Sequence, residues 1–280
     1  MTYVVLLTLC SLGFQQLLRT AQVRRTNVLT VGAVNYMIAA VGSAVLYAFD
    51  RADAESISWV AVALGAVNGV LFATHLYIIL ASYRRAGVGI TIAVTQCGGV
   101  LAILGTWLLW DEPMTHARWA AVAMLPLAIM LMRTGPKQNP HLRITADLLL
   151  LTSFLYFACT QMIHRANQEY VLIESHTSYR ISLWAGAAIT SAAVALARRS
   201  RITGGDMCVG VPLGLVNAAF LVFMVLSLQN VDAVIVFPIL SASTIVLNLI
   251  ASRILWSERF TRRQVIGAVV ATAVICLAQA

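Results

Sequence analysis

The sequence predicts an all-α membrane protein with ten transmembrane helices, arranged as two inverted-topology repeats of five helices. Three observations support this fold class. Of the 280 residues, 60% are hydrophobic and only 11% are charged, whereas soluble domains average roughly 45–50% and about 25%. Apolar runs recur along the whole chain, each near the length of a helical span, about 20 residues. Finally, the two halves share motifs in the same order and have opposite charge in equivalent loops.

Ten apolar runs, each bounded by charged residues, glycine or proline, define the helices. The predicted spans are 2–18, 30–49, 57–81, 87–110, 114–132, 146–163, 177–197, 208–228, 232–256 and 263–279. The segment 133–145 contains glycine, two prolines and several charged residues, which is typical of a linker. We therefore expect a first five-helix repeat in residues 1–132 and a second in residues 146–280.

Motifs recur between the two halves, as expected of a duplication. Leu64–Asn68 reads LGAVN and Leu213–Asn217 reads LGLVN, in the third and eighth spans. The fourth and ninth spans both end in a tryptophan followed two residues later by a glutamate, Glu112 and Glu258. Because each half contains an odd number of spans, the second copy must insert upside down relative to the first.

The loop charges agree with this inversion. The loop after span two is acidic, whereas the equivalent loop after span seven carries Arg198, Arg199 and Arg201. The loop after span one is basic, whereas its equivalent after span six contains Glu169 and Glu174. Cytoplasmic loops are enriched in arginine and lysine. The charges therefore predict that the arginine-rich loops are cytoplasmic and that both termini lie outside.

These motifs resemble the ten-helix, EamA-type members of the drug/metabolite transporter superfamily. The resemblance rests chiefly on the end of each half, where an apolar span is followed by glutamate, threonine and a final helix with glycine. In the second half these residues are Pro238, Glu258, Thr261 and Gly267. The first half departs from the pattern, because Ile92 stands at the position of Pro238 and no glycine follows. The resemblance implies a transporter with both termini in the cytoplasm, opposite to the orientation that the charges predict.

Polar and aromatic side chains within the spans are candidates to line a central substrate cavity, because lone polar groups are unfavourable in lipid. Helical spacing places Asn68, Phe72 and His75 on one face of span three. The other substrate-binding candidates are Gln15, Gln16, Asn35, Tyr36, Gln96, Tyr156, Gln161, Tyr179, Arg180, Trp184, Asn217, Ser241, Thr244 and Asn248. The alternative for each is a hydrogen bond that only joins two helices. His75 is the only histidine well inside a predicted span, and it either exchanges a proton or donates a bond as neutral imidazole.

Other residues are expected to shape the helices. Glu112 and Glu258 stand between consecutive helices, so each is predicted to cap the N-terminus of the helix that follows it. Pro238 is a hinge candidate, with a static kink as the alternative. Gly65 and Gly69 predict close helix packing, either within the chain or in a homodimer.

The distribution of charge indicates the kind of solute. All eleven carboxylates lie at span ends or in loops, and a carrier of phosphorylated solutes would need several cations within its spans. A secondary transporter (an exporter or exchanger) of a small neutral or zwitterionic solute, such as an amino acid, is therefore favoured, working by alternating access.

Two other classes remain open. The alternatives are a non-transporting scaffold or receptor and, less favoured, a membrane enzyme, since HExxH and GxSxG motifs are absent from the sequence. We expect neither a cofactor, a metal nor a nucleic-acid partner. The arginine-rich composition suggests a prokaryotic plasma (inner) membrane.

Labelling of an engineered cysteine tests the orientation. In a background without the five native cysteines, Ser200→Cys lies beside Arg199 in a basic loop and should resist an impermeant maleimide in intact cells. Ala54→Cys, in the acidic loop of the opposite sign, serves as the control and should react readily. Ready labelling at position 200 with protection at position 54 would reverse the orientation.

Overall fold

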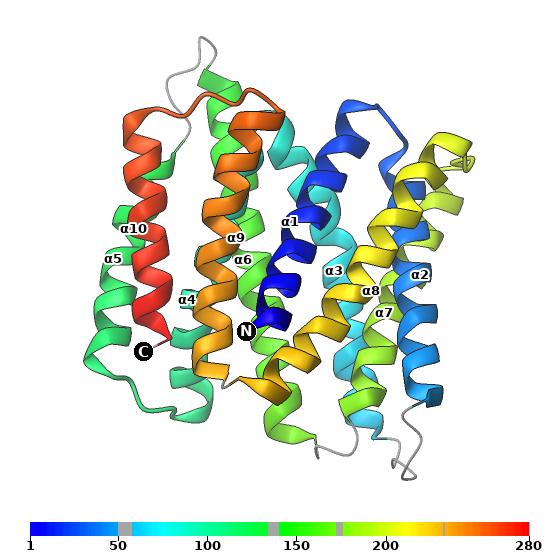
Figure 1. Cartoon of the computed structure of the whole chain (residues 1–280), viewed down its shortest axis with the longest axis horizontal. Coiled ribbons are helices and arrows are strands. Elements are labelled where there is room, and N and C mark those ends of the chain that lie inside the picture. Colours follow the sequence, from blue (N-terminus) through cyan, green and yellow to red (C-terminus); the bar gives the residue numbers. More distant parts are fainter. Residues whose placement is uncertain (50–57, 134–139, 172–175, 232, 280) are drawn as a thin grey trace. The chain divides into compact units, whose positions relative to one another are not determined.

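The computed structural model describes the whole chain except residues 50–57, 134–139, 172–175, 232 and 280. Regular structure in the described residues consists of α-helices (Figure 1). Their bounds are α1 Thr2–Val23, α2 Val28–Phe49, α3 Trp59–Ala86, α4 Val88–Trp110, α5 His116–Met132, α6 Pro140–Tyr170, α7 His176–Ala197, α8 Gly204–Asn230, α9 Ala233–Leu255 and α10 Arg262–Ala278. The ten predicted helices are thus confirmed.

The distribution of side chains is that of a protein dissolved in lipid. Eight helices are long and apolar enough to cross a membrane, and α5 and α10 have 17 residues each. Large apolar side chains such as Ile189 and Leu196 are 69% and 75% exposed, whereas Asn35 and Asn248 are fully buried. Lipid accepts apolar surface but offers no hydrogen bonds, so the chain is an integral membrane protein.

The sixth helix is longer than the sequence predicts. The expected span was 146–163, but α6 runs from Pro140 to Tyr170. Proline suits the first position of a helix, where its missing N–H has no partner to lose. Near the other end, Arg165 and Glu169 form a salt bridge of 2.9 Å at i, i+4 spacing. This pair stabilises the helix, although charged residues at these positions resemble a loop in the sequence. Residues 140–145 of the predicted linker therefore belong to α6.

The helices form two compact units, and each unit combines helices from both predicted repeats. Unit 1 contains α4, α5, α9 and α10, and unit 2 contains α2 and α7. The four remaining helices are divided at nearly equivalent points of the repeats, after Gln16 in α1, Tyr77 in α3, Met162 in α6 and Val222 in α8. The compact bodies are therefore not the two repeats, whose limits remain a prediction.

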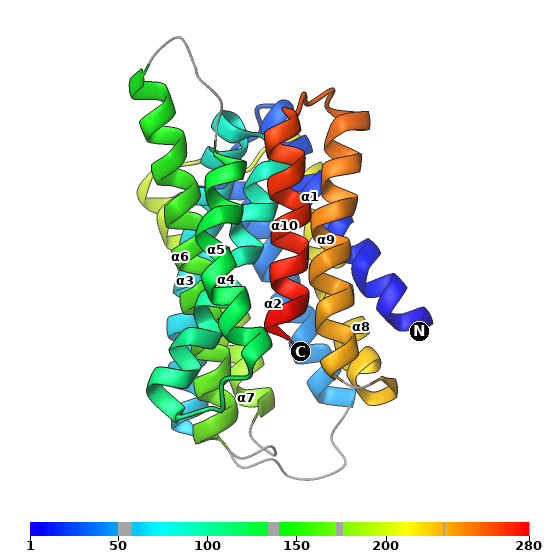
Figure 2. The ribbon, with the colours of Figure 1, turned by 90° about the vertical axis from the view of Figure 1, so that its left-hand side faces the viewer.

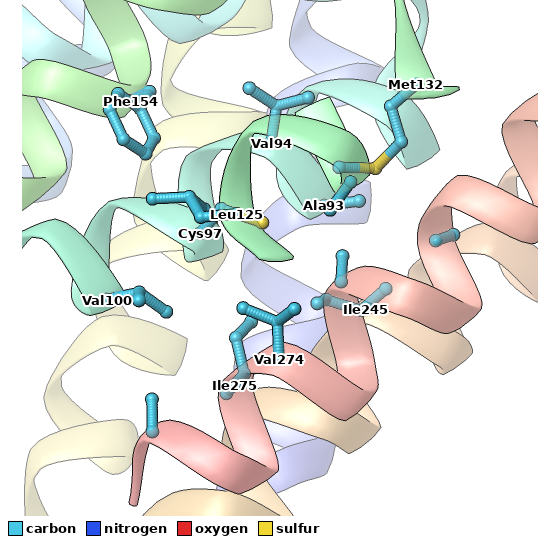
Figure 3. Packing of buried hydrophobic residues seen from close by; sticks show 14 of the residues in the cluster. Ala93, Val94, Cys97, Val100, Leu125, Met132, Phe154, Ile245, Val274 and Ile275 are labelled. Atoms are coloured by element: carbon cyan, nitrogen blue, oxygen red, sulfur yellow. The ribbon is translucent and has the colours of Figure 1, made fainter. Parts of the chain in front are cut away.

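Unit 1 is built around two pairs of repeat-equivalent helices, α4 with α9 and α5 with α10. In both pairs the helices run antiparallel, and α10 lies alongside α5 and α9 in both views (Figures 1 and 2). The core between them includes Cys97, Leu125, Ile245 and Val274 (Figure 3). Gly267 faces α5, where a Cβ would lie 2.8 Å from the Leu131 side chain.

Unit 2 pairs the equivalent helices α2 and α7, also antiparallel. Glycines of the repeated motif bring two further helices against this pair. A Cβ at Gly65 of α3 would lie 2.4 Å from the carbonyl oxygen of Tyr179 in α7. A Cβ at Gly214 of α8 would lie 2.8 Å from the carbonyl oxygen of Asn35 in α2. The LGAVN and LGLVN motifs thus make equivalent contacts, as an inverted duplication predicts, and Gly65 packs within the chain.

The connections α4–α5 and α9–α10 also share one backbone conformation. Asp111 and Ser257 are both left-handed, with φ of 50° and 53°. Thr115 and Thr261 are the N-caps of α5 and α10, with φ, ψ of −70°, 161° and −73°, 155°. Both threonine side chains accept a hydrogen bond from the first turn of the helix.

Glu258 caps a different helix from the one expected. Because Thr261 already caps α10, the Glu258 carboxylate is available to another helix and accepts hydrogen bonds from the backbone N–H groups of Val88 (2.8 Å) and Gly89 (3.3 Å). These groups belong to the first turn of α4, where the helix dipole favours a negative charge. A residue of the second repeat therefore completes a helix of the first.

Alanine at Gly65 or Gly214 should destabilise the protein. Because backbone carbonyl oxygens, which cannot rotate away, would lie 2.4 and 2.8 Å from the added Cβ atoms, we expect a loss of about 1–3 kcal/mol for each substitution, measured as a lower thermal unfolding temperature in detergent. Gly204→Ala is the matched control, since a Cβ there meets nothing within 4 Å. An equal loss in all three variants would contradict the role of close packing.

Candidate transport site

The structure divides the predicted cavity residues between the two units. Unit 2 holds Asn35, Tyr36, Asn68, Phe72, His75, Tyr179, Arg180, Trp184 and Asn217. Unit 1 holds Gln15, Gln16, Gln96, Tyr156, Gln161, Ser241, Thr244, Asn248 and the hinge candidate Pro238. The two groups differ in their bonding, and each is described by itself.

Unit 2 contains a continuous row of rings, here named the aromatic cluster: Tyr36, Trp184, Phe72, His164 and Tyr179. Trp184 stacks on Tyr36 with ring centroids 6.0 Å apart and meets Phe72 edge-on at 5.8 Å. His164 lies edge-on to Phe72 at 6.1 Å and to Tyr179 at 5.5 Å. These separations are those of favourable aromatic pairs. Rings from α2, α3, α6 and α7 therefore form one connected row.

Hydrogen bonds fix the orientation of this cluster. The Asn68 amide donates to the Tyr179 hydroxyl oxygen at 2.6 Å, and that oxygen lies 2.8 Å from His164 Nδ1. Asn68, Tyr179 and His164 all have a hydrogen-bond partner when the Tyr179 O–H donates to Nδ1. The proton of a neutral imidazole is then on Nε2. At the other end, the Tyr36 hydroxyl donates to the Phe72 carbonyl oxygen at 2.9 Å.

His164 is a member of this cluster that the sequence analysis missed. The predicted span six ended at residue 163, because Arg165 and Glu169 indicated a loop. The structure continues α6 to Tyr170, so His164 lies inside a helix and His75 is not the only such histidine. The i, i+4 spacing of Arg165 and Glu169 is the signal that would have extended the helix.

The two asparagines of the repeated motif each reach the helix that their glycine contacts. Asn68 bonds to Tyr179 of α7, and Asn217 donates to Asn35 of α2 across 3.4 Å. Asn35 is fully buried, and its own Nδ2 makes no hydrogen bond with the described residues. A buried amide with an unused donor is unfavourable unless a ligand or water accepts its bond.

Arg180 follows the cluster in α7 and is partly buried. Its Nη2 donates to the Thr177 hydroxyl at 3.0 Å, a bond within its own helix. A guanidinium has five N–H donors, so this contact leaves donors for a carboxylate.

In unit 1 the candidates bond to one another. Gln16 donates to Asn248 Oδ1 at 2.8 Å and accepts from the Trp256 indole N–H at 2.7 Å. Ser11 and Thr244 share a hydrogen bond of 3.1 Å, and the Tyr83 hydroxyl donates to Gln15. These bonds join α1 to α9 and α3, which is the interhelical role described as the alternative.

The remaining candidates of unit 1 are less enclosed. Gln96, Tyr156 and Ser241 are partly buried, and Gln161 is exposed. α9 continues as a helix on both sides of the partly buried Pro238.

The ten helices, with exposed apolar side chains and buried, hydrogen-bonded polar groups among the described residues, are those of a polytopic membrane protein. Comparison with known proteins gives its class. The model of the EamA-like transporter family matches residues 144–279, which include most of α6 and all of α7–α10. The second half of the chain therefore resembles membrane transporters of the EamA type, in the drug/metabolite transporter superfamily.

A solved structure, described only as the crystal structure of a protein, shares the fold. The similarity covers 99% of this chain and 98% of the other, with a TM-score of 0.64 and 15% sequence identity. Among curated proteins, none matches the chain. At this identity the likeness concerns the fold alone.

Removing the Tyr179 hydroxyl tests the hydrogen-bonded chain. Tyr179→Phe keeps the ring but leaves the Asn68 donor and His164 Nδ1 without this partner, so we expect a loss of about 1–3 kcal/mol, measured as a decrease in thermal stability in detergent. Tyr3→Phe, at an exposed tyrosine, is the control and should change stability little. Equal stability of Tyr179→Phe and the wild type would show that these hydrogen bonds do not contribute to the stability of the protein.

Proposed function

We propose that this protein is a secondary transporter of a small neutral or zwitterionic organic solute, such as an amino acid or related metabolite. It acts as an exporter or exchanger in a prokaryotic plasma membrane. The observation that carries the proposal is the aromatic cluster of unit 2 with its hydrogen-bonded amide, phenol and imidazole. Aromatic surface with a few fixed polar groups is typical of sites for small organic molecules.

The individual groups suit parts of an amino acid. The Tyr36, Trp184 and Phe72 rings offer a surface for an apolar or aromatic side chain. Arg180 has guanidinium donors beyond its bond to Thr177, and these suit one carboxylate. The unused Nδ2 of Asn35 is a further donor for a polar solute atom. A single cation of this kind matches a zwitterion better than a phosphorylated solute.

The mechanism proposed is alternating access. In transporters with inverted repeats, substrate sites become accessible from either side by movement of nearly rigid bodies. Here we propose that each compact unit, rather than each sequence repeat, is such a body. The bending would then fall near the points where α1, α3, α6 and α8 pass from one unit to the other, with Pro238 as a further hinge candidate.

Transport by the purified protein tests this function directly. In proteoliposomes preloaded with unlabelled solute, we expect saturable counterflow of radiolabelled phenylalanine or leucine and none of glucose 6-phosphate. Protein-free liposomes are the control. Absence of counterflow for a panel of neutral amino acids, nucleosides and related metabolites would favour the alternative, a non-transporting scaffold or receptor.

Two substitutions on α3 test the site. Asn68→Ala should reduce transport by about tenfold, the effect of losing one buried hydrogen bond. His75→Ala should also reduce transport, and insertion and yield should be unchanged in both variants. Thr74→Ala is the matched control, because its hydroxyl bonds only to carbonyl groups of its own helix, Val70 and Leu71. Unchanged transport in both test variants would remove α3 from the solute pathway.

A further inference from the structure

Two arginine-rich loops of unit 2 are joined into one surface. The connections α1–α2 and α7–α8 lie at the same end of this unit (Figure 1). Asp206, in the first turn of α8, accepts a hydrogen bond from the Asn27 backbone N–H at 2.8 Å. Its other oxygen accepts from the Thr203 N–H and hydroxyl, at 2.9 and 2.8 Å. These hydrogen bonds join the two loops, and they are shielded from the surface because Asp206 is only 1% exposed.

Five exposed arginines lie in these two connections, and together they are named the arginine surface: Arg24, Arg25, Arg198, Arg199 and Arg201. Salt bridges found between described residues join Arg133 to Asp147 and Arg165 to Glu169, and none involves the arginine surface. The nearby carboxylate, Asp206, is already occupied by backbone and hydroxyl donors. The five charges therefore face outward as a concentrated positive patch.

The two loops of the arginine surface also share one backbone conformation. Two residues beyond the ends of α1 and α7, an arginine is in the left-handed region, Arg25 with φ 54° and Arg199 with φ 50°. In both loops the next N–H closes the turn, from Thr26 to Ala21 (3.1 Å) and from Ser200 to Ala195 (2.9 Å). Glycine is favoured at this position of a helix end, because a Cβ is strained there. Glycine would be less strained than arginine at both positions.

Apolar side chains border the same patch. Val23 precedes Arg24 and is 54% exposed, Leu196 precedes the arginines of the second loop and is 75% exposed, and Ile202 follows Arg201 and is 60% exposed. Val23 and Leu196 lie at the ends of membrane-spanning helices, and Ile202 lies between α7 and α8. A partner for this surface must therefore offer a negative group next to a hydrocarbon chain.

We propose that the arginine surface binds an anionic phospholipid, with the headgroup phosphate held by the arginines and an acyl chain lying against Val23 and Leu196. Guanidinium groups bind phosphate through paired, charge-assisted hydrogen bonds, and basic residues at a membrane surface attract anionic lipids. A free phosphate ion would satisfy the arginines but would leave the apolar border unused. The proposal is independent of the transported solute.

Binding of fluorescent phosphatidylglycerol to the full-length protein in detergent tests this site. We expect saturable binding that unlabelled phosphatidylglycerol displaces, whereas phosphatidylcholine and inorganic phosphate do not. The double variant Arg25→Gly/Arg199→Gly should weaken binding by about thirtyfold, the effect of two basic residues near a lipid surface. Arg165→Gln, at the opposite end of unit 2, is the matched charge control and should bind as the wild type.

Thermal unfolding without added lipid shows whether the double variant is folded. Glycine suits both left-handed positions, so its unfolding temperature should equal or exceed that of the wild type. Wild-type affinity in this folded variant would overturn the proposal. Displacement by inorganic phosphate as effective as that by phosphatidylglycerol would also overturn it, in favour of a simple anion site. Should the double variant unfold early, Arg25→Gly and Arg199→Gly are measured singly under the same criteria.

Discussion

The structure of unit 2 depends on one constraint: within a bilayer, a polar side chain can bond only to other parts of the protein. Asn68 and Asn217 meet this constraint by reaching across to a neighbouring helix, and each stands three residues after a glycine of the repeated motif. Gly65 and Gly214 let the backbones approach closely enough for these amides to reach. The glycine allows the two helices to approach each other closely, and the asparagine forms a hydrogen bond between them.

This pairing explains why repeat and compact unit do not coincide. Each glycine–asparagine motif binds a helix of the other repeat, so α3 joins α7 and α8 joins α2. In unit 1, the Glu258 carboxylate caps α4 in the same cross-repeat manner. Each unit is thus held together in part by contacts between helices of different repeats.

Much of this could be predicted from sequence, and the failures share a cause. The ten helices follow from local composition, and the equivalence of the two halves follows from short motifs such as LGAVN. The aromatic cluster was named in part, because Tyr36, Phe72, Tyr179 and Trp184 are conspicuous within apolar spans. His164 was missed because its neighbours Arg165 and Glu169 resemble a loop unless their mutual salt bridge is considered. The partner of Glu258 lies 170 positions away in the chain, a contact that local capping rules do not reach.

The combination of helices from both repeats in each unit has a consequence for biosynthesis. Helices leave the ribosome in order, so α4 is inserted long before Glu258 exists to cap its first turn. Likewise, α2 and α3 are inserted before α7, which both helices contact in unit 2. Neither unit can therefore be complete until helices of the second repeat have been synthesised.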